Sequence, residues 1–285
     1  MSDESVILEE SAPLDIRFSE AELEATREHI VAFVDDFVDS AGADGAVLGL
    51  SGGIDSTLTA YLAVEALGAD GVHGLVMPSE VNAADNMSDA ERVARDLGIE
   101  YDVVDIGPIY DAFVEAFPGE ATATRVETDS LRTAAGNVRV RIRAVLNYFV
   151  ANAENRIVLG TGNRSEALTG YFTKYGDGAV DCHPIGNLYK QQVRQLAAHV
   201  GVDDDLVTKT PSAEMWTGQT DESEMGLGYD TLDAILALHV DGPLSRSATV
   251  RHLDVTAEQV DRVVDLYELS AHKRVFPPSP DPLHR

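Results

Sequence analysis

The sequence is poor in cysteine and in lysine. Cys182 is the only cysteine among 285 residues, so an internal disulfide is impossible, and no second thiol exists for a CxxC redox pair or a zinc site. Only four of the 21 basic residues are lysines.

No run approaches the roughly 20 apolar residues of a membrane helix, and the start, MSDESVILEE, lacks the basic and apolar regions of a signal peptide. We therefore expect a cytoplasmic protein with no membrane partner and no cysteine redox chemistry.

Positive charge is scarce as well. The chain has 49 Asp and Glu against 21 Lys and Arg, a formal net charge of -28 and a pI near 4.4. So strong a negative field repels nucleic-acid phosphates, which disfavours a polynucleotide-binding protein. Disorder is another cause of acidic composition, but the regular apolar periodicity argues against it. We interpret the excess as an acid-rich surface suited to a salt-rich, halophilic cytoplasm.

The order of the apolar segments predicts the fold class. A first amphipathic helix is predicted over 19–40, where Ser19 and Glu22 have the spacing of a capping box. A long helix is predicted over 138–152. Short apolar runs predict buried strands at 46–50, 72–77, 101–106 and 156–159. Strands that alternate with helices indicate an α/β protein with a doubly wound parallel sheet and flanking helices, in which ligands collect at the carboxyl ends of the strands.

The length and the 44% hydrophobic content fit one catalytic domain over 15–285. Residues 1–14 are predicted to be an acidic surface arm. From Tyr189 onward the pattern is mainly helical, but the polar segment 208–228 lacks clear periodicity. Such a segment is typical of a lid over a functional site or of a partly disordered loop.

The strongest local signal is the hexapeptide Ser51-Gly52-Gly53-Ile54-Asp55-Ser56, which lies between an apolar strand and a helix-like segment. Glycines let the backbone turn sharply and approach an anion, whose charge the backbone amides and the helix N-terminus can then stabilise. Ser-Gly-Gly alone is also a common turn, so the complete hexapeptide in this context is what favours a phosphate site. The Gly-Lys-Ser/Thr of a Walker A loop is missing.

This hexapeptide resembles the SGGxDS loop of the ATP-pyrophosphatase superfamily, whose members cleave ATP between the α- and β-phosphates and adenylate a carbonyl or carboxyl oxygen. The loop does not distinguish NAD synthetase from GMP synthetase, asparagine synthetase or tRNA-modifying relatives. Three later blocks closely resemble NAD synthetase: GNVRVRIR at 136–143, LGTGNRSE at 159–166 and GYFTKYGDGAVD at 170–181. The resemblance spans about 46–278 in the expected order and implies an adenine nucleotide alpha hydrolase-like, Rossmann-like fold.

The resemblance also implies roles for particular residues. Asp55 and Glu166 are the expected magnesium ligands, and with Lys190 they are the expected catalytic groups. The expected ATP contacts are Gly49, Leu50, Ser51, Gly52, Gly53, Ile54, Asp55, Ser56, Thr161, Lys190 and Ser212. The expected deamido-NAD contacts are Arg141, Lys174, Asp181, His272 and Lys273.

Ordinary structural explanations exist for several of these residues. Asp55 could be a helix N-cap, and Glu166 could be a solvated carboxylate in the first turn of a helix. Arg139, Arg141 and Arg143 could form a basic helix face. Three of the four lysines nevertheless occupy motif positions, which favours a functional role in a chain that otherwise avoids lysine.

The activity implied by the resemblance is the amidation of deamido-NAD with ammonia, in which ATP gives AMP and pyrophosphate through a deamido-NAD adenylate. Mg²⁺ is the implied cofactor and a homodimer the implied assembly, with 138–152 as part of the interface. Glutamine-using relatives carry a glutaminase domain with a catalytic cysteine, and this chain has neither the spare length nor a suitable cysteine. Free ammonia is therefore the expected donor, unless a separate subunit delivers it.

Two other functions remain open at this point. Another adenylating ligase or a tRNA-modifying enzyme of the same superfamily would share the phosphate loop, although the net charge opposes an RNA substrate. A nucleotide-binding regulator on the same fold would bind ATP without releasing pyrophosphate.

If the acid-rich surface is an adaptation to salt, the melting temperature should climb as KCl is raised into the molar range. Cations then screen the repulsion among the surface carboxylates. Scanning calorimetry across a KCl series measures this directly, and a melting temperature that does not change with salt would remove the hypothesis.

Overall fold

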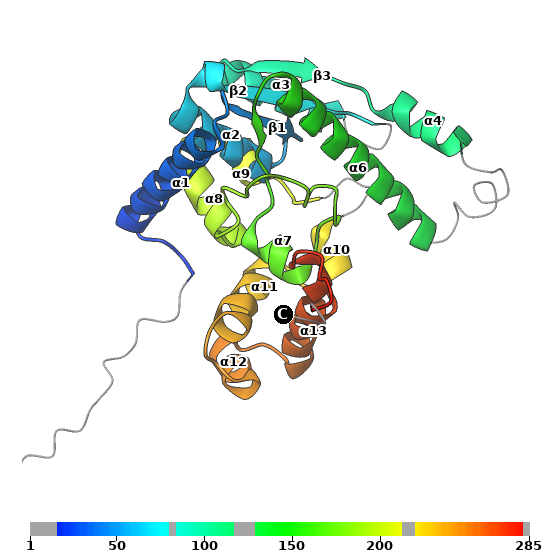
Figure 1. Ribbon diagram of the computed structural model, residues 1–285. Helices are drawn as coiled ribbons and strands as arrows, with labels where there is room; N and C mark the ends of the chain where they lie inside the picture. Colours follow the sequence, from blue (N-terminus) through cyan, green and yellow to red (C-terminus); the bar gives the residue numbers. More distant parts are fainter. Residues whose placement is uncertain (1–15, 80–83, 117–128, 213–219, 282–285) are drawn as a thin grey trace, which may run out of the picture.

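The computed structural model describes residues 16–79, 84–116, 129–212 and 220–281. These residues contain a four-stranded parallel sheet with helices on both faces (Figure 1). Its strands, in the order β3-β2-β1-β4, are β1 (Ala46–Leu50), β2 (Val72–Val76), β3 (Glu100–Val103) and β4 (Ile157–Val158). The predicted doubly wound α/β fold is confirmed. None of the helices in the described part of the chain combines the length and the apolar character needed to cross a membrane.

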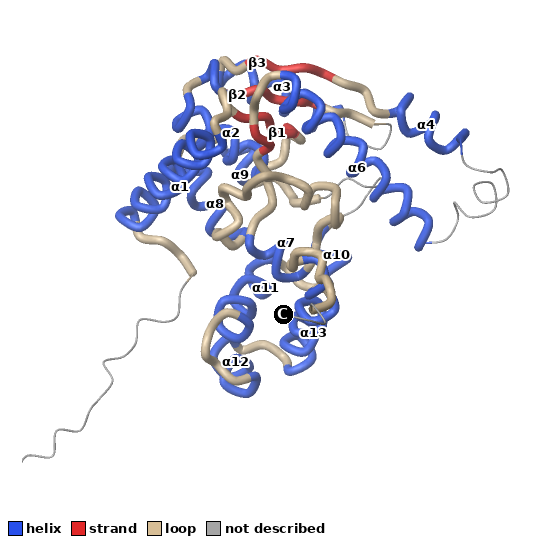
Figure 2. Tube along the Cα trace, in the orientation of Figure 1, coloured by secondary structure: helices blue, strands red, loops and turns tan. Residues whose placement is uncertain are grey.

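The helices follow the strands in alternation through the first half of the chain and dominate the second half (Figure 2). They are α1 (Glu20–Ala41), α2 (Ile54–Leu67), α3 (Ala84–Leu97), α4 (Gly107–Ala116), α6 (Asp129–Ala153), α7 (Arg164–Thr169), α8 (Lys190–His199), α9 (Asp204–Val207), α10 (Asp221–Met225), α11 (Tyr229–Ile235), α12 (Arg246–Leu253) and α13 (Ala257–Leu269).

Local sequence signals set several of these boundaries. The predicted capping box starts α1, since the Ser19 hydroxyl accepts from the Glu22 amide and the Glu22 carboxylate accepts from the Ser19 amide at 2.8 Å. Three predicted ranges differ from the structure. Helix α6 begins at Asp129, well before 138, and β3 covers 100–103 where 101–106 was predicted. Strand β4 covers only 157–158 of the predicted 156–159, and Leu159 pairs with Cys182 in an isolated bridge.

The two faces of the sheet are covered by different helices. Alternate residues of β1, such as Leu48 and Leu50, join the core formed with α1, α2, α3 and α8. Val47 points to the opposite face, where it belongs to the smaller core that includes Ala151 of α6. This period of two is what a strand buried on both sides requires.

The carboxyl-terminal helices have a core of their own. Leu168 of α7 and Tyr189 pack there with buried residues of α11 and α13, among them Tyr229 and Val260. In Figure 1 these helices lie below the sheet, and α7 and α8 lie between the two layers. The segment 208–228, predicted to be a lid or a partly disordered loop, contains α10, and its residues 213–219 lie outside the described part. The predicted arm 1–14 also lies outside it.

The strand order determines where a ligand site can form. The chain proceeds outward from β1 to β2 and β3 on one side, and β4 joins β1 on the other side. The crevice at the carboxyl ends of β1 and β4 is therefore a topological switch point, where open α/β sheets bind their ligands.

A glycine at the end of α7 lets the carboxyl-terminal segment approach that helix closely. Gly170 ends α7 with φ 69°, and a Cβ atom at this position would lie 2.1 Å from Cβ of Ser270. Gly42 ends α1 with a similar φ of 65°, but a Cβ atom there would meet nothing within 4 Å. Both glycines have a left-handed backbone, but only Gly170 has a neighbour that an added Cβ atom would contact.

We expect Gly42→Ala to lower the free energy of unfolding by about 1 kcal/mol, the cost of a left-handed alanine. Gly170→Ala should lower it by about 3 kcal/mol or more, because overpacking against Ser270 adds to that cost. Urea denaturation at one fixed KCl concentration measures both values. Equal losses in the two variants would show that the contact with Ser270 relaxes freely.

Candidate functional site

A cavity of about 480 Å³ opens at the switch point. Its wall is formed by the SGGIDS loop after β1, the glycine-rich loop after β4, the amino-terminal end of α8, part of α6 and the segment 209–212. Every residue predicted to contact ATP lies on this wall: Gly49, Leu50, Ser51, Gly52, Gly53, Ile54, Asp55, Ser56, Thr161, Lys190 and Ser212. The cavity thus brings together residues that are far apart in the sequence.

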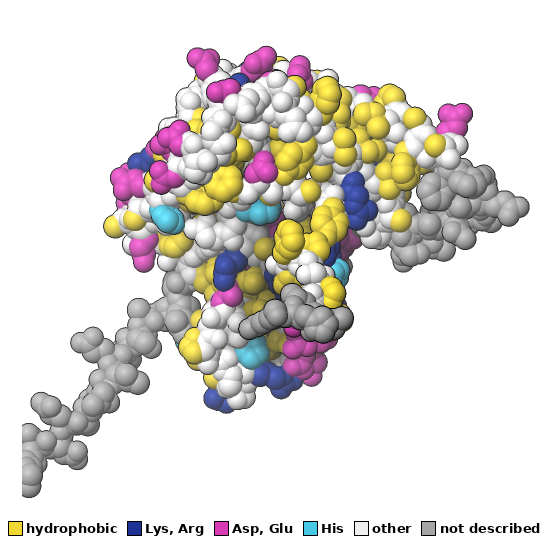
Figure 3. Space-filling view, viewed as in Figure 1, with side chains coloured by type: hydrophobic (Ala, Val, Ile, Leu, Met, Phe, Trp, Pro, Cys, Tyr) yellow, Lys and Arg dark blue, Asp and Glu magenta, His cyan; other side chains and the backbone are white. Residues whose placement is uncertain are grey.

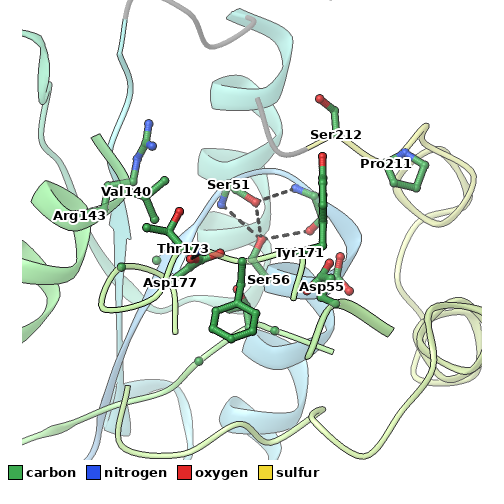
Figure 4. A pocket seen from close by; sticks show the side chains of 18 of the residues that line it. Ser51, Asp55, Ser56, Val140, Arg143, Tyr171, Thr173, Asp177, Pro211 and Ser212 are labelled. Atoms are coloured by element: carbon green, nitrogen blue, oxygen red, sulfur yellow. Dashed lines mark hydrogen bonds between the residues drawn. The ribbon is translucent and has the colours of Figure 1, made fainter. Parts of the chain in front are cut away.

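The SGGIDS loop turns sharply and leaves a helix N-terminus open to the cavity. Gly52 has a φ of 75°, a conformation that glycine adopts without strain. Ser51 and Ser56 face each other across the loop with their hydroxyl oxygens 3.1 Å apart (Figure 4). The N-cap of α2 is Gly53, which offers no side-chain cap, so the first amides of α2 are available to an anion. The explanation of Asp55 as the N-cap is therefore wrong.

Lys190 lies buried between the two carboxylates predicted to be metal ligands. Its ammonium group donates to Oδ2 of Asp55 and lies 3.7 Å from Oε1 of Glu166. Only 3% of its side chain is exposed, against 17% for Asp55 and 19% for Glu166. Burial alone would lower the pKa of Lys190, but the two carboxylates outweigh it and raise that pKa, which keeps the ammonium charged.

Glu166 is in a different electrostatic situation. Burial, followed by the negative charge of Asp55, raises the pKa of Glu166 to about 8. Lys190 opposes this rise but does not cancel it. A divalent cation between the two carboxylates would relieve the same repulsion. Glu166 does lie in the first turn of α7, but only 19% of its side chain is exposed and its Oε2 accepts from the backbone amide of Asn163, so it is not a freely solvated carboxylate.

Asn163 connects the two carboxylates and was not predicted to belong to the site. Its side chain donates to Oδ1 of Asp55 at 2.8 Å, and its backbone amide donates to Oε2 of Glu166 at 3.1 Å. Asn163 and Glu166 form the capping box of α7. The Asn-x-x-Glu spacing in the block 159–166 is a signal from which this arrangement could have been predicted.

A second layer fixes the amino-terminal end of α8. Asp233 of α11 accepts from the hydroxyl of Ser165 at 2.5 Å and from the backbone amide of Gln191 at 2.8 Å. The Ser165 oxygen in turn accepts from the backbone amide of Lys190 at 3.0 Å. Burial raises the pKa of Asp233 to about 6. These bonds orient the first turn of α8, and with it Lys190.

The residues predicted to contact deamido-NAD divide into two groups. Lys273 lines the cavity and donates to the carbonyl oxygens of Gly170 and Phe172, both at 2.7 Å. The other four do not line it. Arg141 donates to the carbonyl of Lys174 at 3.1 Å, and the ammonium of Lys174 donates to the carbonyl of His272 at 2.6 Å.

Asp181, the remaining member of that predicted set, makes two structural bonds. Its carboxylate accepts from the backbone amide of Val158 at 2.7 Å and from the hydroxyl of Tyr148 at 3.1 Å. These bonds connect the loop after β4 to the end of that strand and to α6. Arg141 and Tyr148 also line a shallow groove on the outer side of α6.

Several ionisable residues on the cavity wall were missed by the sequence predictions. They are Arg143, Asp177, Lys209, Asp221 and Glu224. Asp177 lies within the block 170–181, where its position could have been noticed, and its carboxylate accepts from the backbone amide of Thr173 at 2.6 Å. Glu224 accepts from the hydroxyl of Tyr171 at 2.7 Å. No sequence pattern indicated Lys209.

The described residues contain no group of three or more histidine, cysteine or acidic side chains arranged to hold a metal ion. Asp55 and Glu166 provide two hard oxygen donors on the same wall as the phosphate loop. One or two protein carboxylates, completed by substrate phosphates and water, are the ligands Mg²⁺ usually takes. The pair therefore fits a magnesium ion that arrives with a nucleotide.

A parallel α/β sheet with SGGIDS at its switch point, and with a buried lysine that joins the aspartate of that loop to a second carboxylate, defines an adenylate-forming enzyme of the ATP-pyrophosphatase type. Comparison with known families narrows the class. Residues 26–277 match the family model described as NAD synthase, and the chain belongs to that family.

Individual relatives agree with this assignment. An NH(3)-dependent NAD(+) synthetase from Halobacterium salinarum is 60% identical over 269 residues, which cover 94% of this chain and 97% of the relative. An NMN synthetase from Francisella tularensis superposes with a TM-score of 0.77 at 35% identity, covering 93% of this chain and all of that one. An NH3-dependent NAD synthetase from Campylobacter jejuni superposes with a TM-score of 0.73 at 29% identity, covering 91% and 99%.

Proposed function

We propose that this cavity catalyses the ATP-dependent amidation of deamido-NAD with ammonia, which gives NAD, AMP and pyrophosphate through a deamido-NAD adenylate. The observation that supports this most directly is the buried cluster in which Lys190 and Glu166 meet Asp55 of the SGGIDS loop. The family assignment and the Halobacterium salinarum relative point to the same reaction.

The first step joins two anions, because a nicotinate carboxylate must approach the α-phosphate of ATP. The SGGIDS loop and the open N-terminus of α2 are placed to receive the departing pyrophosphate. Lys190 acts as a point charge beside the reacting phosphoryl group. A bound magnesium ion, held by Asp55 and Glu166, would neutralise charge on the phosphate oxygens. Ammonia then attacks the acyl carbon of the adenylate and AMP leaves, so positioning and electrostatics supply the catalysis without a protein nucleophile.

Cys182 takes no part in this chemistry. Only 8% of it is exposed, and burial raises the pKa of its thiol to about 12, so the thiolate is scarce at neutral pH. A thiol in that state is unsuited to glutamine hydrolysis. This supports free ammonia as the nitrogen donor.

Deamido-NAD is too large for Lys273 alone to position. We propose that it extends from the cavity toward the surface formed by Arg141, Lys174 and His272, with Asp181 supporting the wall between them. The similarity to an NMN synthetase raises a second candidate acceptor, nicotinate mononucleotide, which carries the same carboxylate without the adenylate half. Direct competition between the two acceptors decides which one the cavity prefers.

The function predicts that NAD forms from deamido-NAD, ATP and MgCl₂ when ammonium chloride is the donor, with one AMP per NAD. Glutamine should not replace ammonium, and omission of Mg²⁺ should abolish turnover. The assay is run at low and at molar KCl, with nicotinate mononucleotide as the competing acceptor. Pyrophosphate release without an amidated product would indicate a different adenylating ligase, and ATP binding without any release would indicate a regulator.

Glu166→Gln keeps the size of the side chain and removes the carboxylate that could hold a magnesium ion. It should lower kcat about 100-fold or more, the magnitude seen when a group that stabilises transition-state charge is lost. Asp261→Asn is the matched control, since Asp261 forms an exposed ion pair with Arg246 outside the cavity. Equal activity in both variants would exclude Glu166 from the reaction.

We further propose that the protein is a homodimer that pairs through the outer side of α6. Val145 and Phe149 on this helix are 68% and 70% exposed, and the nearby Tyr175 is 57% exposed. Figure 3 shows apolar side chains gathered over this part of the molecule. Exposed apolar patches of this kind mark interaction surfaces. A partner at this face would also cover Arg141.

Phe149→Asp should therefore convert the protein to a monomer, because it places a charge in the apolar interface. Light scattering coupled to size exclusion in molar KCl measures the mass. Leu269→Asp is the control, since Leu269 is an equally exposed apolar residue on α13. A wild-type mass equal to one chain at micromolar concentration would refute the dimer.

A further inference from the structure

Lys209 is the only lysine of the chain that the motif analysis left without a role, and it contacts the phosphate loop. Its ammonium group donates to the carbonyl oxygen of Gly52 at 3.0 Å. The same group donates to Oδ2 of Asp89, on α3, at 2.6 Å. The side chain lines the cavity and 27% of it is exposed.

The contact with Gly52 fixes the orientation of one peptide group. In a trans peptide the carbonyl and the following amide point in opposite directions. When Lys209 holds the carbonyl of Gly52, the amide of Gly53 points the other way. That amide donates to the hydroxyl oxygen of Ser51 at 3.2 Å, and Ser51 faces the cavity (Figure 4).

Asp89 keeps the ammonium in place. Its second oxygen, Oδ1, accepts from Arg92 at 3.2 Å, and Arg92 also forms ion pairs with Asp203 and Asp205 beside α9. The carboxylate of Asp89 therefore bridges two cations, and only one of them reaches the loop. Glycine at 52 and 53 gives the peptide enough freedom to flip, so an external restraint has an effect here.

The other cations of the cavity wall have different partners. Lys190 is bound between Asp55 and Glu166, and Lys273 is bound to two carbonyl groups at the end of α7. Arg143 donates to the carbonyl of Met77 at 3.0 Å. Lys209, in contrast, donates to the backbone of the SGGIDS loop.

We propose that Lys209 is a positioning residue for the phosphate loop: held by Asp89, it fixes the Gly52–Gly53 peptide so that the Gly53 amide is turned toward the pyrophosphate that leaves ATP. The amide exchanges its bond with Ser51 for a bond with a phosphate oxygen when the anion arrives. This rests on the proposed function in so far as pyrophosphate is the leaving group. The bond from Lys209 to Gly52 also joins the segment 209–212 of the cavity wall to the SGGIDS loop.

The test measures the binding of magnesium pyrophosphate to the full-length protein by titration calorimetry in molar KCl. Lys209→Met should weaken binding about tenfold, since one charge-assisted bond that orients an anion-binding amide is lost. Lys209→Arg should recover part of the affinity, because arginine can still donate to the Gly52 carbonyl. Arg95→Met is the matched control, because it removes one cation from α3, and Arg95 pairs with Glu91 outside the cavity.

Asp89→Asn separates positioning from direct contact. If Asp89 holds Lys209 on the loop, this variant should also weaken pyrophosphate binding. If Lys209 instead swings onto the phosphate, releasing it from Asp89 should tighten binding, and that outcome would overturn the proposal. Lys209→Met that binds like Arg95→Met would overturn it as well.

The result is independent of whether NAD is formed. Failure of the wild type to make NAD refutes the proposed function, whereas equal pyrophosphate affinity in wild type and Lys209→Met refutes only the role of Lys209. Thermal melts followed by circular dichroism accompany each titration. If Lys209→Met does not fold, the Asp89→Asn and Lys209→Arg affinities decide the question.

Discussion

The ammonium group of Lys190 lies out of water between Asp55 and Glu166. A buried charge costs several kcal/mol in lost solvation unless its partners are correctly placed. The two carboxylates come from the starts of α2 and α7, and the lysine from the start of α8. The cluster can therefore form only if three turns that are far apart in the sequence meet at one point. The parallel sheet meets this condition by placing β1 beside β4.

The need to place Lys190 accurately explains why the residues behind the start of α8, Asp233 and Ser165, are polar although they are buried. Asp233 and Ser165 are almost inaccessible to solvent, and burying them is unfavourable unless their hydrogen bonds are satisfied. Both are satisfied by groups at the start of α8 and α7. The carboxyl-terminal helices thus contribute more than a second core, because α11 supplies the carboxylate that orients Lys190. The hydrogen bonds of Asp233 therefore join the carboxyl-terminal helices to the helices at the sheet through the site.

Local signals were enough to predict much of this arrangement. The capping box at Ser19, the strand 46–50 and the SGGIDS loop each depend on neighbouring residues, and they are found as predicted. The start of α6 was missed because its first turns lack a clear apolar period. The capping box of Asn163 and Glu166 has a local signature, but the bond from Asn163 to Asp55 and the role of Asp233 depend on contacts between distant segments, which no local pattern reveals. Lys209 is the clearest case, since its partners Gly52 and Asp89 precede it by more than a hundred residues.

The charged residues of the cavity wall also determine how a polyphosphate can enter the cavity. Five carboxylates on the wall, Asp55, Glu166, Asp177, Asp221 and Glu224, face four cations, Arg143, Lys190, Lys209 and Lys273. A nucleotide that arrived alone would bring further negative charge to a wall that already has these five acidic groups. A nucleotide that arrives with magnesium brings its own counter-ion, which can replace Lys190 as the partner of Asp55 and Glu166. Lys190 would then be released toward the phosphates at the moment when they need a cation. The ion pairs with Asp55 and Glu166 thus hold Lys190 at the cavity wall, and a magnesium ion held by the two carboxylates would let the lysine pair with the phosphates instead.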